Sequence, residues 1–354
     1  MLAGYEIDDT IALPPNANLG IGIIGCGGIV NYAHLPAYRK AGLNILACYD
    51  QNPETARTTA VVHAIPVVSG SLEKLLANPE IAIVDIAIHP GAQLDVALQA
   101  IAAGKHLLCQ KPLSDNYPDA VRIVEAAEAA GVQIAVNQQM RWSAGMRVAK
   151  QLITQGAIGT PADARIEVSV RTPWHMWPWI GESERIEIMF HSIHYQDSIR
   201  YLFGDPSGVT SIHRRFPNQP ERGETRSQTV FTYPDELTVL IDVDHHNWSD
   251  DVYARFRFLG DRGIITGTIG LLYDYPAGRV DSLCYQANDK QHIWHEADLH
   301  TWWIPDAFLG PMASLMEAIH TGQPALTNGR DNLGTLHTVF ASYQSAAENR
   351  MIPL

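Results

Sequence analysis

Short apolar runs alternate with helical patterns in the first part of the chain, and this alternation restricts the fold more than any other feature. The runs are residues 21–25, 43–50, 81–88, 105–110 and 132–138. Strands that are apolar throughout and separated by amphipathic helices are typical of a parallel sheet covered on both faces. We therefore predict a doubly wound α/β domain over residues 19–140, preceded by a Pro- and Asn-rich leader, residues 1–18.

The pattern changes after about residue 160. One long helical segment, about 184–203, is followed by runs in which apolar and polar residues alternate, at 210–216, 227–233, 237–245, 252–260 and 263–270. Such runs without crossover helices predict successive antiparallel strands. We expect residues 141–354 to form an α+β domain with a large open, mainly antiparallel sheet, and the last two helices to pack back on one of the domains.

Two overlapping glycine patterns lie at the first strand. Gly20 begins one G-x-G-x-x-G pattern inside the apolar run, whereas Gly25 begins another that follows the run and opens a helix. A dinucleotide needs the second arrangement, because its pyrophosphate sits on the N-terminus of the helix. The residues of this turn that we expect to contact a nucleotide are Gly25, Cys26, Gly27, Gly28, Ile29 and Val30, the last replacing the third glycine.

Asp50 ends the second apolar run, close to the distance at which an acid binds the ribose in such folds. Its carboxylate would accept both ribose hydroxyls and repel a 2′-phosphate, and Gln51, Asn52 and Pro53 provide no Arg. NAD is favoured over NADP, while the alternative role of Asp50 is to cap a turn. The sheet edge also carries His89 after the third strand-like run, where it would line the nicotinamide pocket.

Composition excludes several classes of partner. The 38 Asp and Glu outnumber the 25 Lys and Arg, and no dense basic run could follow a phosphate backbone, so nucleic acid is not expected. No segment has the roughly 20 continuous apolar residues of a membrane-spanning helix, and residues 1–18 lack the features of a secretory signal. Four scattered cysteines indicate reduced thiols. We expect a cytoplasmic protein without a membrane partner.

A family resemblance adds to these inferences. The turn Gly25-Cys26-Gly27-Gly28 with His34-Leu35-Pro36, the segment 104–112 (GKHLLCQKP) and the later helix with Ile193-His194-Tyr195-Gln196-Asp197 resemble the glucose-fructose oxidoreductase/inositol dehydrogenase/rhizopine catabolism (Gfo/Idh/MocA) family. The resemblance covers nearly the whole chain. It implies an NAD(P)-dependent oxidoreductase acting on a secondary alcohol or hemiacetal carbon of a sugar, cyclitol or glycoside. It also implies a homodimer or homotetramer formed through the open sheet.

Lys111 matches the family's catalytic lysine, in a Lys-Pro pair after an apolar strand. The carboxyl end of such a strand is where ligands bind in this fold, and desolvation can lower a lysine's pKa enough for proton transfer. The alternative is a surface lysine after a strand. The family's Glu before this lysine is Gln110 here, which keeps the size but not the charge, so a Glu–Lys charge pair is absent. We expect Gln110 and Lys111 also to line the cofactor site.

His194 aligns with the family's active-site histidine, and an imidazole with a pKa near ~6.5 can accept the alcohol proton. The family commonly has Asp four residues earlier, where this chain has Phe190. His191, one turn before His194, is then either a polar contact to substrate or a replacement in a shifted proton relay. Which of Lys111 and His194 accepts the proton stays open.

A metal site is the less favoured interpretation of the same helix. Glu187, His191, His194 and Asp197 have spacings that could bind a metal with ligands added from His245 and His246. The family generally uses no metal, and we expect none.

The segment 171–187 is rich in tryptophan. Indole faces stack on sugar rings and indole N–H groups donate to hydroxyls, which suits a carbohydrate pocket; a hydrophobic loop packed on a neighbouring subunit is the alternative. Trp248, Trp302 and Trp303 have no assigned role. The residues that we expect to bind substrate are Gln138, Arg141, Trp174, His175, Trp177, Trp179, His191 and His194.

Two other functions compete with a sugar or cyclitol dehydrogenase. One is a reaction without net redox, an epimerase or eliminating glycosidase that holds and recycles its NAD. The other is a non-catalytic, nucleotide-dependent regulator, against which the presence of Lys111 and His194 argues. Retained cofactor, with turnover that needs no added NAD, would favour the first of these.

Overall fold

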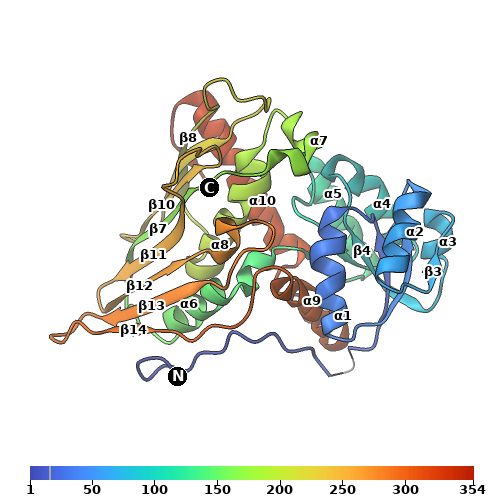
Figure 1. The fold of residues 1–354 in the computed structure, drawn as a ribbon, viewed down its shortest axis with the longest axis horizontal. Coiled ribbons are helices and arrows are strands. Elements are labelled where there is room, and N and C mark those ends of the chain that lie inside the picture. Colours follow the sequence, from blue (N-terminus) through green and yellow to red (C-terminus); the bar gives the residue numbers. More distant parts are fainter. Residues whose placement is uncertain (16) are drawn as a thin grey trace. The chain divides into compact units, whose positions relative to one another are not determined.

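The computed structural model describes residues 1–15 and 17–354, which divide into two compact units. The Rossmann unit comprises Ile11–Gln139 and Ile304–Leu333. The open-sheet unit comprises Met1–Thr10, Met140–Trp303 and Gly334–Leu354. Figure 1 shows the elements of both units in chain order.

The Rossmann unit is built on a parallel sheet, as the continuous apolar runs predict. Among the described residues its strand order is β3-β2-β1-β4-β5-β6, with every neighbouring pair parallel. The order reverses beside β1, and ligands bind at the carboxyl ends of strands at such a switch point. The strands are β1 (Gly20–Ile24), β2 (Ile45–Tyr49), β3 (Val67–Val68), β4 (Ile81–Ile86), β5 (His106–Cys109) and β6 (Ile134–Val136).

The helices of this unit begin at residues suited to that position. Asn52, Ser71 and Asn116 each accept a hydrogen bond from a backbone N–H of the helix that follows, which satisfies a donor left unpaired by the helix. The helices are η1 (Val30–His34), α1 (Leu35–Lys40), α2 (Pro53–Val62), α3 (Leu72–Leu76), α4 (Pro90–Ala102), α5 (Tyr117–Ala130), η6 (Asp306–Phe308) and α9 (Leu309–Thr321). Of these, α9 packs on β5 and β6.

Pro36 does not interrupt the first helix as its ring would suggest. The wider π-helical turn η1 runs directly into α1, and Pro36 occupies the first turn of α1. A proline is tolerated in the first turn of an α-helix, and the chain stays helical through residue 40.

The open-sheet unit contains a mixed sheet. Its order in the described part of the chain is β14-β13-β12-β11-β7-β10-β9-β8-β15, and only β7 and β10 pair in parallel there. The mainly antiparallel sheet expected from the sequence is thus confirmed. The strands are β7 (Pro161–Ser169), β8 (Gly208–Arg214), β9 (Arg226–Thr232), β10 (Thr238–Asp244), β11 (Tyr253–Gly260), β12 (Gly263–Thr268), β13 (Ser282–Ala287), β14 (Trp294–Glu296) and β15 (Ile352–Pro353).

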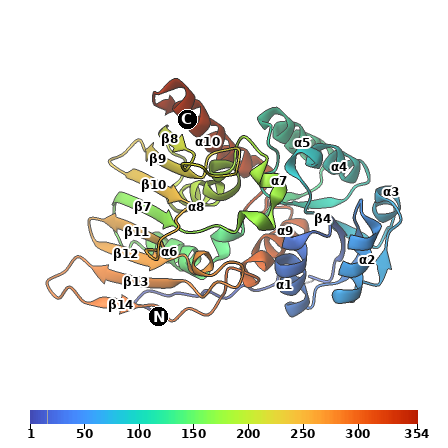
Figure 2. The same cartoon turned by 45° about the horizontal axis from the view of Figure 1, so that its top comes forward.

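Helices cover one face of this sheet (Figure 2). Helix α6 packs on β12 and β13, and α8 packs on β10. The helical elements of the unit are η2 (Gln139–Trp142), α6 (Ala144–Thr154), η3 (Trp174–Met176), α7 (Pro178–Gly181), η4 (Ile188–Ser192), α8 (Ile193–Phe203), η5 (Gly270–Tyr273) and most of α10 (Gly329–Glu348). Neither α6 nor β7 was predicted from the sequence, and the helix expected from residue 184 begins at Glu187.

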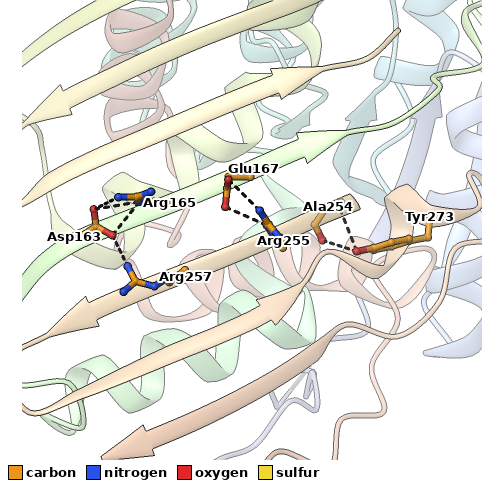
Figure 3. Close-up of polar contacts among 7 residues, drawn as sticks. All are labelled: Asp163, Arg165, Glu167, Ala254, Arg255, Arg257 and Tyr273. Atoms are coloured by element: carbon orange, nitrogen blue, oxygen red, sulfur yellow. Dashed lines mark hydrogen bonds and ion pairs between the residues drawn. The ribbon is translucent and has the colours of Figure 1, made fainter. Parts of the chain in front are cut away.

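The opposite face of the sheet carries charged side chains. In β7, Ala164, Ile166 and Val168 are buried, and the alternate residues Arg165 and Glu167 point the other way. Figure 3 shows the ion pairs that these side chains form, within β7 and between β7 and β11. Those pairs join Glu167 to Arg255, at 3.1 Å between Oε2 and Nε, and Asp163 to both Arg165 and Arg257.

The expected leader does not form one piece. Met1–Thr10 belongs to the open-sheet unit, where the Asp8 N–H donates to the side chain of Gln151 in α6 and the Glu6 N–H to that of Gln155, the C-cap of this helix. Within the residues that the structure describes, no helix combines the length and apolar character needed to span a bilayer.

Candidate active site

The glycine turn after β1 has the features of a nucleotide site. Gly25 has φ of 90°, and a Cβ there would overlap the main-chain carbonyl of Ala87, so that only glycine fits. A Cβ on Gly27 would meet no protein atom within 4 Å, and Gly27 and Gly28 are exposed. By contrast, Gly20 is in β1, where a Cβ would overlap the Glu80 carbonyl. Gly20 therefore serves close strand packing.

Side chains orient the main chain of this turn. The Asn31 amide donates to the carbonyls of Cys26 and Gly27, both at 2.9 Å, and so holds these oxygens toward the helix. Asp50 accepts from the Cys26 N–H at 2.8 Å and from the Asn52 N–H at 2.8 Å, one bond to each oxygen. Each oxygen keeps a lone pair for a further donor, which a ribose hydroxyl could supply.

Lys111 lies just after β5, separated from it by Gln110, at the carboxyl edge of the Rossmann sheet. Its side chain is half-buried, and desolvation lowers its pKa to about 7. The Gln110 side chain accepts from the Lys111 N–H at 2.8 Å. His89 lies after β4 at the same edge and accepts from the Gly91 N–H at 3.1 Å, which makes it the N-cap of α4.

Gln138, after β6, is buried at the same edge of the sheet. Neither its amide oxygen nor its amide nitrogen has a hydrogen-bond partner within residues 1–15 and 17–354. A buried amide normally forms such bonds, since an unsatisfied polar group is costly. An incoming ligand could satisfy both atoms, which supports its assignment to substrate.

In the open-sheet unit, His194 lies in the first turn of α8. It is buried, and the Trp303 ring contacts it edge-on with centroids 5.6 Å apart. Phe190, which stands where the family commonly has Asp, contacts the Trp179 ring edge-on at 5.3 Å. Trp303 was given no role from the sequence, and its contact with His194 links it to the site.

His191 lies in a buried cluster that the sequence did not predict. Its ring lies 4.4 Å from that of His245, which follows β10, and Trp174 contacts it edge-on at 5.1 Å. Glu187 Oε1 is 4.0 Å from His245 Nε2. Burial raises the pKa of Glu187 to about 8 and lowers that of His245 to about 3. At neutral pH the carboxyl is therefore largely protonated and the imidazole neutral, so the two do not form an ion pair.

The tryptophan-rich segment divides between two environments. Trp174 is buried in the His191 cluster, whereas Trp179 is 42% exposed and His175 is exposed. Trp177 is half-buried and contacts Tyr275 edge-on at 5.2 Å. Trp174 is thus part of the core, and the exposed side chains are those that a ligand or a partner subunit could reach.

Arg141 and Asp197 form a buried ion pair. Arg141 Nε and one terminal nitrogen donate to the two Asp197 oxygens, both at 2.7 Å, and the Thr335 hydroxyl donates to the same carboxylate at 2.8 Å. Asp197 therefore faces Arg141 and not the histidines, and this structural role accounts for much of Arg141's donor capacity. Its contact with substrate stays a prediction.

The metal ligands considered from sequence do not form a metal-binding arrangement, although Glu187, His191 and His245 lie in one cluster. Within the described residues, no group of three or more His, Cys, Asp or Glu side chains could hold a metal ion. His246, for example, stacks on Phe216 with ring centroids 4.8 Å apart.

Comparisons with known proteins now identify the family. Residues 19–138 match a model described as an oxidoreductase family with an NAD-binding Rossmann fold, and residues 146–266 match the Gfo/Idh/MocA C-terminal domain. A 1,5-anhydro-D-fructose reductase of Ensifer adhaerens is 31% identical over 340 residues, covering 92% of this chain and 96% of that protein. The chain belongs to the Gfo/Idh/MocA family. It is an oxidoreductase of the NAD(P)-dependent dehydrogenase type.

Two further proteins are similar to this chain over most of its length. A D-apiose dehydrogenase of Paraburkholderia graminis is 28% identical over 342 residues, covering 94% of this chain and 88% of that protein. The solved structure of an oxidoreductase from Agrobacterium radiobacter, in complex with NAD+, L-tartaric acid and magnesium, has a TM-score of 0.85. It is 23% identical and covers 95% of this chain and 98% of that chain, a likeness that concerns the fold.

Proposed function

We propose that this Gfo/Idh/MocA protein is an NAD-dependent dehydrogenase of a sugar, cyclitol or glycoside. It would transfer hydride between a secondary alcohol or hemiacetal carbon and the nicotinamide. The observation that carries the proposal is the half-buried Lys111 at the carboxyl edge of β5, whose pKa is lowered to about 7 by desolvation. The relatives' names, D-apiose dehydrogenase and 1,5-anhydro-D-fructose reductase, support a carbohydrate substrate.

The residues of the glycine turn fit a dinucleotide. Exposed Gly27 and Gly28 leave space for a pyrophosphate against the start of the helix, and the main-chain carbonyls of Cys26 and Gly27 are held away by Asn31. Asp50 would hold the ribose, with His89 and Gln110 beside the nicotinamide half. Bound NAD supplies the hydride acceptor.

NAD is preferred to NADP in this proposal because Asp50 would repel a 2′-phosphate. The nearest arginine that follows, Arg57, forms an ion pair with Glu54. Asp50→Ser should narrow the difference between the dissociation constants of NADH and NADPH, measured by titration of nicotinamide fluorescence. An unchanged ratio would show that Asp50 does not set the preference.

Lys111 and His194 would handle the hydroxyl proton. A group with a pKa near 7 is suited to exchange a proton at neutral pH, because both of its protonation states are then populated. Desolvation lowers the pKa of Lys111 into this range, and Lys111 lies at the carboxyl edge of the Rossmann sheet. His191 would act as a polar contact or relay to His194, since Phe190 cannot provide the carboxylate found in relatives.

Substrate contacts would come from Gln138, whose buried amide can bond to sugar hydroxyls, and from the exposed Trp179 and His175, with Trp177 and Arg141 nearby in sequence. A flat indole stacks on the C–H face of a sugar ring. Because Trp174 is buried in the His191 cluster, its part would be to position His191.

The outer face of the open sheet would form a homodimer or homotetramer. Its charged side chains form ion pairs within the face (Figure 3). A second copy could therefore cover the face without burying a charge that has no counter-charge. Ile212, on the same face of β8, is 51% exposed. Val230 of β9 and Leu240 of β10 oppose each other beside Arg165 and lie on this face. Light scattering on Val230→Glu/Leu240→Glu should show a smaller species than wild type, and an unchanged mass would exclude this face. A cytoplasmic location agrees with four free thiols.

The direct test is to mix the protein with NAD, and separately NADP, across aldoses, cyclitols and glycosides, and to follow reduced nicotinamide by absorbance. Lys111→Met should lower the rate at least ~100-fold, as loss of a general acid–base does, and the exposed Lys290→Met is the matched control. Absence of turnover on every substrate, with NAD(H) released only on denaturation, would instead indicate a reaction in which the hydride returns to the product.

A further inference from the structure

A buried series of hydrogen bonds in the Rossmann unit leads from Asp85, near the end of β4, to the main chain of Lys111. Asp85 Oδ2 in β4 lies 2.7 Å from His34 Nδ1 and accepts from the Tyr38 hydroxyl at 2.8 Å. On the other side of the imidazole, His34 Nε2 lies 3.2 Å from the side-chain nitrogen of Gln110. His34, Asp85 and Tyr38 are each fully buried.

The contacts of Gln110 determine the protonation of His34. The Gln110 oxygen accepts from the Lys111 N–H at 2.8 Å. Turning this amide over would place its NH₂ group against another donor, so its NH₂ must face His34. Asn137 Nδ2 also lies 3.2 Å from His34 Nε2. His34 Nε2 is thus an acceptor without a proton, and the ring proton is on Nδ1, which donates to Asp85.

A second buried amide fixes the chain on both sides of Lys111. Gln93, in α4, donates to the main-chain carbonyl of Gln110 at 3.0 Å and to that of Pro112 at 2.7 Å. Gln93 is fully buried. Side chains from α4 and from η1 therefore hold the residues before and after Lys111, and neither set of contacts uses its ammonium group.

We propose that His34 is a positioning residue for Lys111, acting through Gln110, and that glutamine at position 110 is matched to a neutral His34. The inference rests on the proposed role of Lys111 in handling the hydroxyl proton. A displacement of about 1 Å can reduce catalysis about 100-fold. Hydrogen bonds that hold the main chain of Lys111 in place would keep its ammonium group within reach of the substrate hydroxyl.

A neutral His34 explains why this chain has glutamine at position 110, where the family has glutamate. A glutamate has only acceptors when ionised, so it would need a proton on His34 Nε2 in place of the one that Gln110 donates. That proton would make His34 an imidazolium between two carboxylates. The titratable groups around His34 are Asp85, Tyr38 of α1 and Cys109 of β5, and burial with the Asp85 charge raises the pKa of the Cys109 thiol.

The test measures Lys111 itself, so it does not need the substrate. Amines are acetylated with acetic anhydride over pH 6–10, and the Lys111 peptide is quantified by mass spectrometry, with exposed Lys290 as internal reference. Gln110→Met keeps the shape of the side chain but loses its hydrogen bonds with His34 and with the Lys111 N–H. His34→Asn interrupts the series of hydrogen bonds between Asp85 and Gln110. Either should shift the midpoint of Lys111 labelling by about one pH unit or its rate several-fold, because the environment of the amine changes.

Tyr38→Phe is the matched control. It removes a bond to the same Asp85 carboxylate but lies off the path to Lys111, so it should lower the unfolding temperature and leave Lys111 labelling unchanged. Gln110→Glu should raise the midpoint, since a nearby negative charge favours the ammonium. If Gln110→Met only lowers the unfolding temperature, as Tyr38→Phe does, the chain is structural and the inference is wrong.

The same variants separate this inference from the proposed function. Once a substrate is known, Gln110→Met and His34→Asn should lower kcat about tenfold or more with a smaller change in KM for NAD. Altered labelling without any dehydrogenase activity in wild type would leave His34 as a positioning residue for Lys111 and refute the proposed reaction. If His34→Asn does not fold, Gln110→Met decides.

Discussion

Asp197→Asn should destabilise the open-sheet unit by about 3–5 kcal/mol, because it removes one partner of a buried ion pair. The side chains of Arg141 and Asp197 are 3% and 1% exposed. The substitution leaves the Arg141 charge buried without a counter-charge. It is nearly isosteric, so lost packing contributes little, and the change reports the electrostatic contact.

The hydrogen bonds set the size of the effect. Asp197 accepts two bonds from Arg141 and one from the Thr335 hydroxyl. Bonds to a charged group contribute about 1.5–3 kcal/mol each, and asparagine keeps one acceptor oxygen of the two. The loss of one bond to Arg141 and the weakening of the others give a sum in the stated range.

Tryptophan fluorescence in urea measures this unit selectively. All eight tryptophans of the chain lie between residues 142 and 303, within the open-sheet unit. Asp205→Asn is the matched control, because Asp205 pairs with Arg200 at 2.6 Å but is 74% exposed. Because the Asp205 carboxylate stays in water, we expect its loss to change the free energy of unfolding by about 0–1 kcal/mol, although Arg200 itself is buried.

A loss for Asp197→Asn no larger than that for Asp205→Asn would refute this reasoning. Arg141 would then not depend on Asp197 for its burial. If substrate binding fell at the same time, the result would favour the direct contact between Arg141 and substrate predicted from the sequence.

Two further predictions concern the glycine turn and the His191 cluster. Gly25→Ala should lower the free energy of unfolding by about 1–3 kcal/mol, because φ of 90° is strained for alanine and the added Cβ overlaps a carbonyl. Gly27→Ala should keep the stability but weaken NADH binding. Thermal melts measure the stability and fluorescence titrations measure the binding. Equal effects on both measurements would contradict this distinction. Glu187, with a folded pKa of about 8, binds its proton more tightly than in the unfolded chain, so the wild type should lose stability as pH rises from about 4.5 to 8. Glu187→Gln should remove that loss, worth about 1.4 kcal/mol per pKa unit, in urea titrations at pH 5 and 8.5; parallel pH profiles for the two proteins would exclude a buried, protonated Glu187.

The sequence by itself determined the parallel and the open sheets and the correct glycine pattern. These are local properties, since a strand period of two, a buried apolar run and a glycine before a helix each appear within a few residues. It also predicted catalytic roles for Lys111 and His194, through motifs that lie within short segments. It missed α6 and β7, which lie between the last parallel strand and the first recognised alternation.

Only the tertiary structure decided which polar side chains meet. Asp85 in the apolar run 81–88 was a detectable signal, because a lone acid in a buried strand needs a partner. Its partner His34 is 51 residues away in sequence. His245, at the end of a strand, likewise contacts His191. Asp197 pairs with Arg141 and not with the histidines near it in sequence. Such pairs depend on how strands and helices stack, and the spacing of residues along the chain does not encode those distances.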